Sequence, residues 1–244
     1  MSMLAVGSVR SAGATTLALT LAGCIEGAVL VEADADGGVL ALRYGLSREP
    51  GLLSLAASRQ ASGESLLEHA QRLPGGLPVI VAPESPQRAA QLLRTAGQRV
   101  ATVLAGVEDT QVVVDVGRLS PTSPAGTVAS SASVVLIVAR PRAEELVAAA
   151  ERVAALGDGA GLVLVGSGPY SAADVATQLG CRVFGSIADD VRAAQAMAEG
   201  GGPRRLARSA LVRSARTLAA ALLQVGQSSP SGADGRTEHR VVLA

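Results

Sequence analysis

Residues 3–22 read MLAVGSVRSAGATTLALTLA and run from an apolar strand through a glycine-bearing loop into an apolar helix. A phosphate-binding loop has the pattern G-x-x-x-x-G-K-[ST]. Gly13, Thr15 and Thr16 fall where that pattern places its last glycine and its hydroxyl groups. The pattern is broken twice, because Ser8 stands for the first glycine and Ala14 for the lysine. The stretch therefore predicts a phosphate cradle of backbone amides that lacks its usual cation.

For this loop alone, the alternative is a glycine turn between a strand and a helix of an ordinary Rossmann-like sheet. A dinucleotide-binding G-x-G-x-x-G pattern fits poorly, because the residues around Gly7 and Gly13 do not supply that spacing. The interpretation of the loop therefore depends on what the rest of the chain places beside it.

The composition favours one large α/β domain. The chain has 244 residues, of which 48% are hydrophobic and 1% aromatic, so the core is expected to be aliphatic. All 21 basic residues are arginines, and they are balanced by 21 acidic residues. A net charge of zero and the scarcity of aromatic rings argue against a specific nucleic-acid partner.

Cysteine usage and hydropathy bear on the compartment. Cys24 and Cys181 form no C-x-x-C motif, and the chain opens without a charged and then apolar leader, so we expect a cytoplasmic protein with reduced thiols. No apolar run approaches the length of a membrane span, so any membrane contact is expected to be peripheral, at the inner face of the membrane.

Short apolar strands alternate with helical segments along the chain. This alternation predicts a three-layer α/β sandwich with a mostly parallel sheet of about seven or eight strands. Residues 1–225 form the predicted domain, and 226–244 a disordered tail. After the first strand, the predicted strands span 28–32, 77–83, 111–117, 133–139, 161–165 and 182–187. The main predicted helices span 15–24, 40–44, 52–58, 64–71, 87–104, 143–156, 172–179, 191–199 and 204–224.

Carboxylates follow two of these strands. Glu32, Asp34 and Asp36 follow the second strand, and Asp115 ends the strand at 111–117. Ligands of parallel sheets lie beyond the carboxyl ends of the strands, beside the first loop. Asp115 has the form of an aspartate that helps to hold Mg²⁺, and Gly117 lets the backbone approach a γ-phosphate. The alternatives are a solvated acidic turn at 32–36 and a turn or capping role for Asp115.

The last predicted helix is amphipathic, and two interpretations remain open. Its basic face could dock on an anionic membrane, or its apolar face could pack on the sheet while its arginines are solvated, which we favour. The arginines are Arg204, Arg205, Arg208, Arg213 and Arg216, and the apolar face holds Leu206, Ala210, Leu211, Leu218 and Ala221.

Taken together, these motifs resemble the deviant-Walker P-loop ATPases of the MinD/ParA family over about residues 1–222. Residues 29–46, VLVEADADGGVLALRYGL, are similar to the family's D-x-D switch segment and the short helix after it. The resemblance implies that Asp34 is the hydrolysis-supporting, water-orienting aspartate, with Glu32 in place of the preceding one. It also places Asp115 on the aspartate of the second switch.

The resemblance implies ATP and Mg²⁺ as cofactors. The implied nucleotide-binding residues are Ser8, Val9, Arg10, Ser11, Ala12, Gly13, Ala14, Thr15, Thr16 and Gly117. The implied Mg²⁺ ligands are Thr15 and Asp115.

The departures from the family pattern concern charge. The family loop reads G-K-G-G-x-G-K-T-T, whereas residues 8–16 read SVRSAGATT and contain neither lysine. Val9 stands at the signature lysine, which in the family reaches the partner subunit's phosphates, and Arg10 is a candidate surrogate. Losing one charge-stabilising donor costs about 3 to 4 kcal/mol in a transition state, so hydrolysis is expected to be weak or absent while binding survives.

The sequence thus predicts a nucleotide-binding homodimer with a protein partner that acts in spatial organisation. The expected roles in spatial organisation are chromosome partitioning and the placement of division, secretion or pilus machinery. One alternative is a scaffold of the same fold that has lost nucleotide altogether. Another is a fully active ATPase in which Arg10 replaces the lysine.

Overall fold

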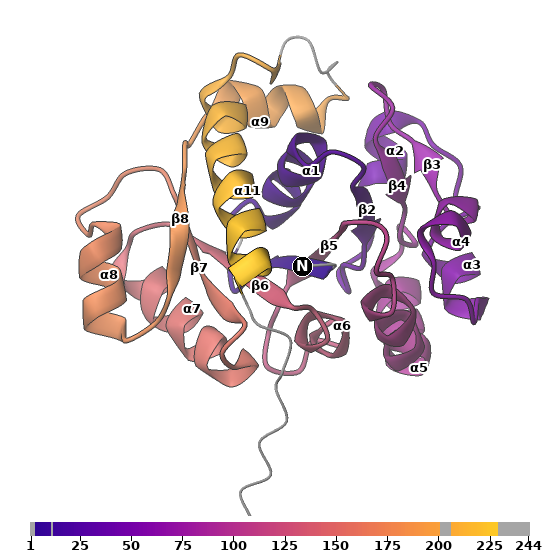
Figure 1. Ribbon diagram of the computed structural model, residues 1–244, viewed down its shortest axis with the longest axis horizontal. Coiled ribbons are helices and arrows are strands. Elements are labelled where there is room, and N and C mark those ends of the chain that lie inside the picture. Colours follow the sequence, from indigo (N-terminus) through magenta and orange to yellow (C-terminus); the bar gives the residue numbers. More distant parts are fainter. Residues whose placement is uncertain (1–2, 11, 201–205, 229–244) are drawn as a thin grey trace, which may run out of the picture.

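The computed structural model describes residues 3–10, 12–200 and 206–228. Within them the strands form one eight-stranded sheet in the order β3-β4-β2-β5-β1-β6-β7-β8 (Figure 1). All neighbouring strands are parallel except β3 and β4. The strands are β1 (Met3–Ser8), β2 (Val29–Glu32), β3 (Gln71–Arg72), β4 (Pro78–Ile80), β5 (Val112–Arg118), β6 (Val134–Ala139), β7 (Ala160–Val165) and β8 (Val183–Ile187).

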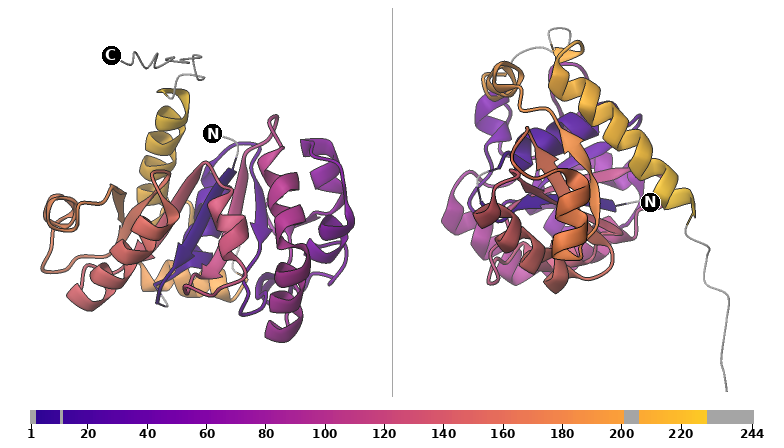
Figure 2. Two further views of the ribbon diagram at one scale, coloured as in Figure 1. Left: turned by 90° about the horizontal axis from the view of Figure 1, so that it is seen from below. Right: turned by 90° about the vertical axis from the view of Figure 1, so that its left-hand side faces the viewer.

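Helices cover both faces of the sheet, which confirms the three-layer α/β prediction (Figures 1 and 2). One core cluster joins the sheet to α3 through α8, and the other joins it to α1, α2, α9 and α11. On the first face lie α3 (Leu52–Ala57), α4 (Gly63–Glu68), α5 (Pro86–Ala105), α6 (Gly126–Ser130), α7 (Ala143–Leu156) and α8 (Ala172–Leu179). On the second lie α1 (Ala14–Cys24), α2 (Leu40–Tyr44), α9 (Val191–Ala198) and α11 (Ala210–Ser228).

The core is aliphatic, as the composition predicts. In the described residues every buried hydrophobic side chain is Ala, Val, Leu, Ile or Met. The central strands β1, β2 and β6 are buried along their whole length. Covered on both faces, such strands need apolar side chains at successive positions, which explains the unbroken apolar runs in the sequence.

Strand β3 was not predicted, because its residues were assigned to the end of a helix over 64–71. In the structure that helix ends at Glu68. Beyond it the chain forms a hairpin, in which the Leu73 N–H donates to Leu77 O at 2.9 Å. Gly75 and Gly76 in its turn have positive φ values of 105° and 90°. The turn folds Gln71 and Arg72 back along β4 in the antiparallel direction.

The last helix starts and ends later than predicted. Ser209 caps its first turn, since the Val212 N–H donates to the Ser209 hydroxyl at 3.1 Å. Helix α11 extends to Ser228, so the predicted domain end at 225 falls inside it, and residues 229–244 of the predicted tail lie outside the described residues. Arg204 and Arg205 also lie outside them.

Helix α11 packs with its apolar face on α1 and β8, as we favoured. Leu211, Leu218 and Leu222 on this face are buried, whereas Ala221, predicted to share it, is exposed. In Figure 2 the C-terminal end of α11 and the start of β1 lie at the same edge of the sheet. This edge is opposite the carboxyl ends of the parallel strands.

Candidate functional site

The loop between β1 and α1 begins after Ser8 and ends at Gly13, which has a positive φ of 89°. The Gly13 carbonyl accepts the Leu17 N–H at 2.9 Å, so α1 starts with a regular helical bond. Among the described residues no side chain caps this N-terminus. The first N–H groups of the helix are therefore open to an anion.

Except for Gly117 on β5, the predicted nucleotide-binding residues lie at the end of β1, along this loop and in the first turn of α1. Ser11 lies outside the described residues. Ala14, the first residue of α1, is 6% exposed and packs in the core. The position where the loop pattern has its lysine therefore carries no charge. Thr15 and Thr16 are half-buried, while Arg10 is exposed. The contribution of each residue to nucleotide binding stays a prediction.

Asp115 is a fully buried carboxylate beside this loop. It lies on β5 between Val6 of β1 and Glu32 of β2, and its side chain is 0% exposed. One oxygen, Oδ1, accepts the Gly117 N–H at 3.1 Å, whereas Oδ2 makes no hydrogen bond of ordinary length and angle among the described residues, although the Thr15 hydroxyl is its neighbour. Burial raises the pKa of Asp115 from 3.8 to about 7; the Thr15 side chain lowers it in part, and the charge of Glu32 raises it further.

A buried carboxylate oxygen that makes no well-formed hydrogen bond, next to a threonine hydroxyl, fits a hard cation such as Mg²⁺. Mg²⁺ usually binds through one or two protein oxygens, phosphates and water, so a larger cluster is not needed. The described part of the chain contains no group of three or more His, Cys, Asp or Glu side chains that could hold a metal ion. Thr15 and Asp115 are the residues that would hold the ion.

Glu32 is placed as a structural residue. It is 1% exposed. Its Oε1 accepts the N–H groups of Val39 at 2.6 Å and Leu40 at 3.1 Å, and its Oε2 accepts that of Ala82 at 3.1 Å. Burial is the main cause that raises its pKa. The predicted catalytic role stays a prediction, and these bonds do not favour it, because they occupy both oxygens.

Asp34 lies closer to the open side of the site. Burial raises its pKa, and the Asp36 N–H, which donates to its Oδ1 at 2.8 Å, offsets part of the rise. Its carboxyl group lies directly over Gly117, where a Cβ atom would overlap it. Asp34 is therefore next to the backbone that we predict to sense a γ-phosphate, in keeping with the predicted water-orienting role, which no observation tests.

Replacing Gly117 with alanine is expected to cost about 2 to 3 kcal/mol of unfolding free energy. Gly117 has a positive φ of 60°, and the new Cβ would displace the Asp34 carboxyl group. Gly180→Ala is the matched control, because Gly180 has the same φ of 60° with nothing within 4 Å of its Cβ position. Urea denaturation followed by circular dichroism measures both; equal losses would contradict the packing of Asp34 on Gly117.

An ion pair that was not predicted joins two strand ends near the loop. Arg140, after β6, donates from Nη1 to Asp189 Oδ2 at 2.6 Å and from Nη2 to Oδ1 at 3.4 Å. The Arg140 hydrogen bond lowers the pKa of Asp189. The two residues are 49 positions apart, and only the parallel arrangement of β6, β7 and β8 brings them together.

The sequence itself matches no protein-family model and no curated protein. Solved structures are similar in fold. A ParA family ATPase from Chlorobium tepidum has a TM-score of 0.71 and 17% identity, covering 90% of this chain and 97% of that one. The cell division ATPase MinD from Pyrococcus furiosus has a TM-score of 0.73 and 16% identity, covering 92% and 99%. The septum site-determining protein MinD from Pyrococcus horikoshii, complexed with Mg-ADP, has 0.72 and 15%, covering 92% and 97%.

The chain has a MinD/ParA-like fold. The likeness extends over nearly the whole length of these structures and over 90% to 92% of this chain. At this identity the likeness concerns the fold, and the roles of single residues rest on the geometry above.

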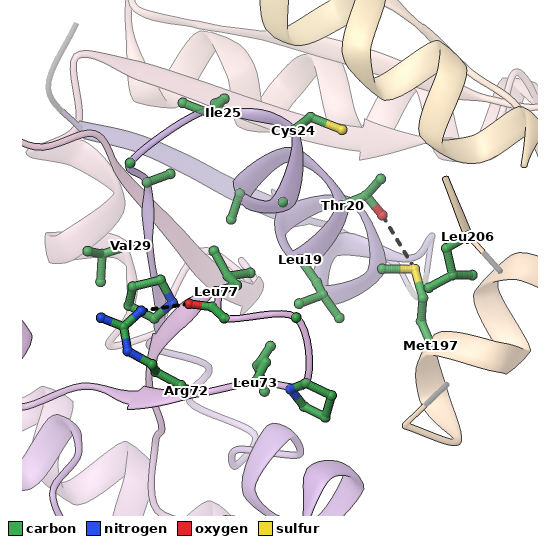
Figure 3. A pocket seen from close by; sticks show the side chains of 18 of the residues that line it. Leu19, Thr20, Cys24, Ile25, Val29, Arg72, Leu73, Leu77, Met197 and Leu206 are labelled. Atoms are coloured by element: carbon green, nitrogen blue, oxygen red, sulfur yellow. Dashed lines mark hydrogen bonds between the residues drawn. The ribbon is translucent and has the colours of Figure 1, made fainter. Parts of the chain in front are cut away.

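A cavity of about 620 Å³ lies away from the loop, on the face of the sheet that α1 covers (Figure 3). Its wall is mostly apolar; the Thr20 hydroxyl bonds to Met197 Sδ at 3.5 Å, and Arg72 Nη1 bonds to Gly76 O at 2.8 Å. No carboxylate and none of the predicted nucleotide-binding residues line it. It is therefore separate from the candidate nucleotide site.

Both cysteines are free and half-buried, and each packs against one of the two core clusters. Over the described ranges, none of the helices combines the length and the apolar composition needed to cross a membrane.

Proposed function

We propose that this chain binds Mg-ATP weakly, hydrolyses it slowly or not at all, and acts in spatial organisation within the cell. The observation that carries the proposal is Asp115, a buried carboxylate beside Thr15 at the N-terminus of α1. A buried carboxylate oxygen that makes no well-formed hydrogen bond costs free energy, and a phosphate-bound cation would satisfy it.

Slow hydrolysis is proposed because the loop contains no cation at the lysine position. Ala14 is buried in the core and Val9 is apolar. Each missing charge-stabilising donor costs about a hundredfold or more in rate. Binding depends less on these lysines, because the helix N-terminus and the backbone N–H groups still face the phosphates.

The role in spatial organisation comes from the fold. Solved structures that share it include proteins described as a cell division ATPase and as a septum site-determining protein. We extend this to chromosome partitioning or the placement of division, secretion or pilus machinery, with a homodimer and a protein partner as the working unit. Up to residue 224 the apolar face of α11 is packed on α1 and β8, which supports a role without membrane docking by this face.

Isothermal titration calorimetry with Mg-ATP tests the proposal. We expect measurable heat at high micromolar to millimolar nucleotide and no steady release of phosphate. The absence of heat at millimolar nucleotide would contradict binding, and steady phosphate release would contradict slow hydrolysis, pointing to the ATPase in which Arg10 replaces the lysine.

A nucleotide-independent scaffold is the second candidate function. It is favoured by one observation, namely that Ala14 is buried in the core at the position where the loop pattern has its phosphate-binding lysine. A scaffold would give no heat in the same titration. It would also keep its oligomeric state in size-exclusion chromatography with and without Mg-ATP.

A further inference from the structure

A small cavity of about 390 Å³ adjoins the phosphate loop, and among the described residues arginines are the only charged ones that line it. Its lining residues are Val9, Arg10, Arg118 and Ala148. None of the described carboxylates lines it, although Asp34 and Asp36 follow the neighbouring strand β2 and Asp115 lies on β5 itself. The cavity is thus suited to an anion, and it lies beside the loop that is short of positive charge.

The backbone of Arg118 is held against this loop. Arg118 is the last residue of β5 and pairs with Ser8, the last residue of β1, after a register shift at Gly7. The next residue, Leu119, donates its N–H to Ser8 O at 2.8 Å. These bonds fix the Cα of Arg118 beside the start of the phosphate loop, directly after Gly117. Every conformation of the Arg118 side chain therefore begins at this point.

The present partner of Arg118 is weakly bound. Arg118 Nε is 3.7 Å from Asp36 Oδ2, and the two side chains are 56% and 64% exposed. An exposed pair of this kind contributes about 1 kcal/mol or less. None of the ion pairs among the described residues involves Arg10. Both guanidinium groups can therefore turn to a stronger anion at little cost.

A nucleotide phosphate is that anion. Guanidinium groups bind phosphate oxygens through paired, charge-assisted hydrogen bonds, and a triphosphate keeps net negative charge even with one Mg²⁺ bound. We propose that Arg118, assisted by Arg10, binds the terminal phosphate of ATP and supplies the positive charge that Ala14 lacks. This inference rests on the proposed nucleotide binding and adds to it a residue from β5, outside the loop.

The proposal predicts a difference between ATP and ADP, because Arg118 contacts the terminal phosphate alone. In calorimetry of the full chain with Mg²⁺, Arg118→Ala is expected to weaken ATP binding about 10- to 100-fold. Binding of ADP is expected to change less than about twofold, since its phosphates remain on the backbone amides. Arg118→Lys should lie between the wild type and Arg118→Ala, because lysine keeps the charge but loses the paired geometry.

Arg94→Ala is the control, because Arg94 is exposed on α5 and lines neither the cavity beside α1 nor the cavity beside the phosphate loop. Urea denaturation shows whether each variant is folded, which we expect because the Arg118 side chain is mostly exposed. If Arg118→Ala binds ATP as tightly as wild type, or loses ATP and ADP equally, Arg118 does not bind the terminal phosphate, and the proposed nucleotide binding still stands. If the wild type binds neither nucleotide, both proposals fail.

Discussion

Replacing Glu32 with alanine is expected to lower the unfolding free energy by about 3 to 4 kcal/mol. The change leaves three backbone N–H groups, those of Val39, Leu40 and Ala82, without their acceptor. Each buried donor left unpaired costs about 1 to 3 kcal/mol, although water entering the space reduces the total. Since a domain is stabilised by only about 5 to 15 kcal/mol, this is a large share, and urea denaturation can measure it.

Two further variants sharpen this result. Glu26→Ala removes an exposed carboxylate just after α1, so its effect should lie within about 0.5 kcal/mol. Glu32→Gln keeps one carbonyl oxygen for Val39 and Leu40 but turns an N–H₂ group toward the Ala82 N–H, and should lie between wild type and Glu32→Ala. If Glu32→Ala unfolded like Glu26→Ala, Glu32 would not have the structural role assigned to it, and the catalytic prediction would regain weight.

The stability of the metal-free protein is expected to fall as the pH rises from about 4 to about 7. Burial raises the pKa of Asp115 from 3.8 to about 7 in the folded chain, while the unfolded chain keeps the ordinary value. Below about pH 4 the carboxyl group is protonated in both states and costs nothing. Above about pH 7 the folded protein must carry a buried charge, at a cost on the order of 4 kcal/mol.

Asp115→Asn isolates this effect. The unfolding free energy of the variant minus that of wild type should increase by about 4 kcal/mol over this pH range, measured in EDTA by urea denaturation. The variant keeps part of the decline, because the pKa values of Glu32 and Asp34 are also raised by burial. Curves that stay parallel for the two proteins would show that Asp115 is already ionised at low pH in the folded state.

Local patterns predicted most of the fold. The helices at 143–156 and 172–179 have the bounds that the sequence predicts, and the second of these carries a capping box between Ser171 and Asp174. The buried strands were found from their unbroken aliphatic runs, which a parallel sheet requires. The carboxylates after β2 and on β5 were also found from their positions alone, because the ends of parallel strands meet at one edge.

Features that depend on contacts between distant segments were not predicted. Strand β3 is two residues long and exists only because the hairpin turn brings it beside β4. The cavity formed by Arg10 and Arg118 joins the loop after β1 to the end of β5, and the sequence gives no signal for it. The burial of Glu32 was also missed, because its partner Ala82 lies 50 residues away.

Because the chain has few aromatic residues, it absorbs and fluoresces only weakly in the near ultraviolet. The chain contains no tryptophan and only two tyrosines, Tyr44, whose hydroxyl donates to Met197 O, and Tyr170, which is exposed. Light that excites tryptophan alone would thus meet no absorber in the chain. A fluorescent nucleotide, or one tryptophan introduced near the loop, would report binding at the candidate site without tryptophan fluorescence from the rest of the chain.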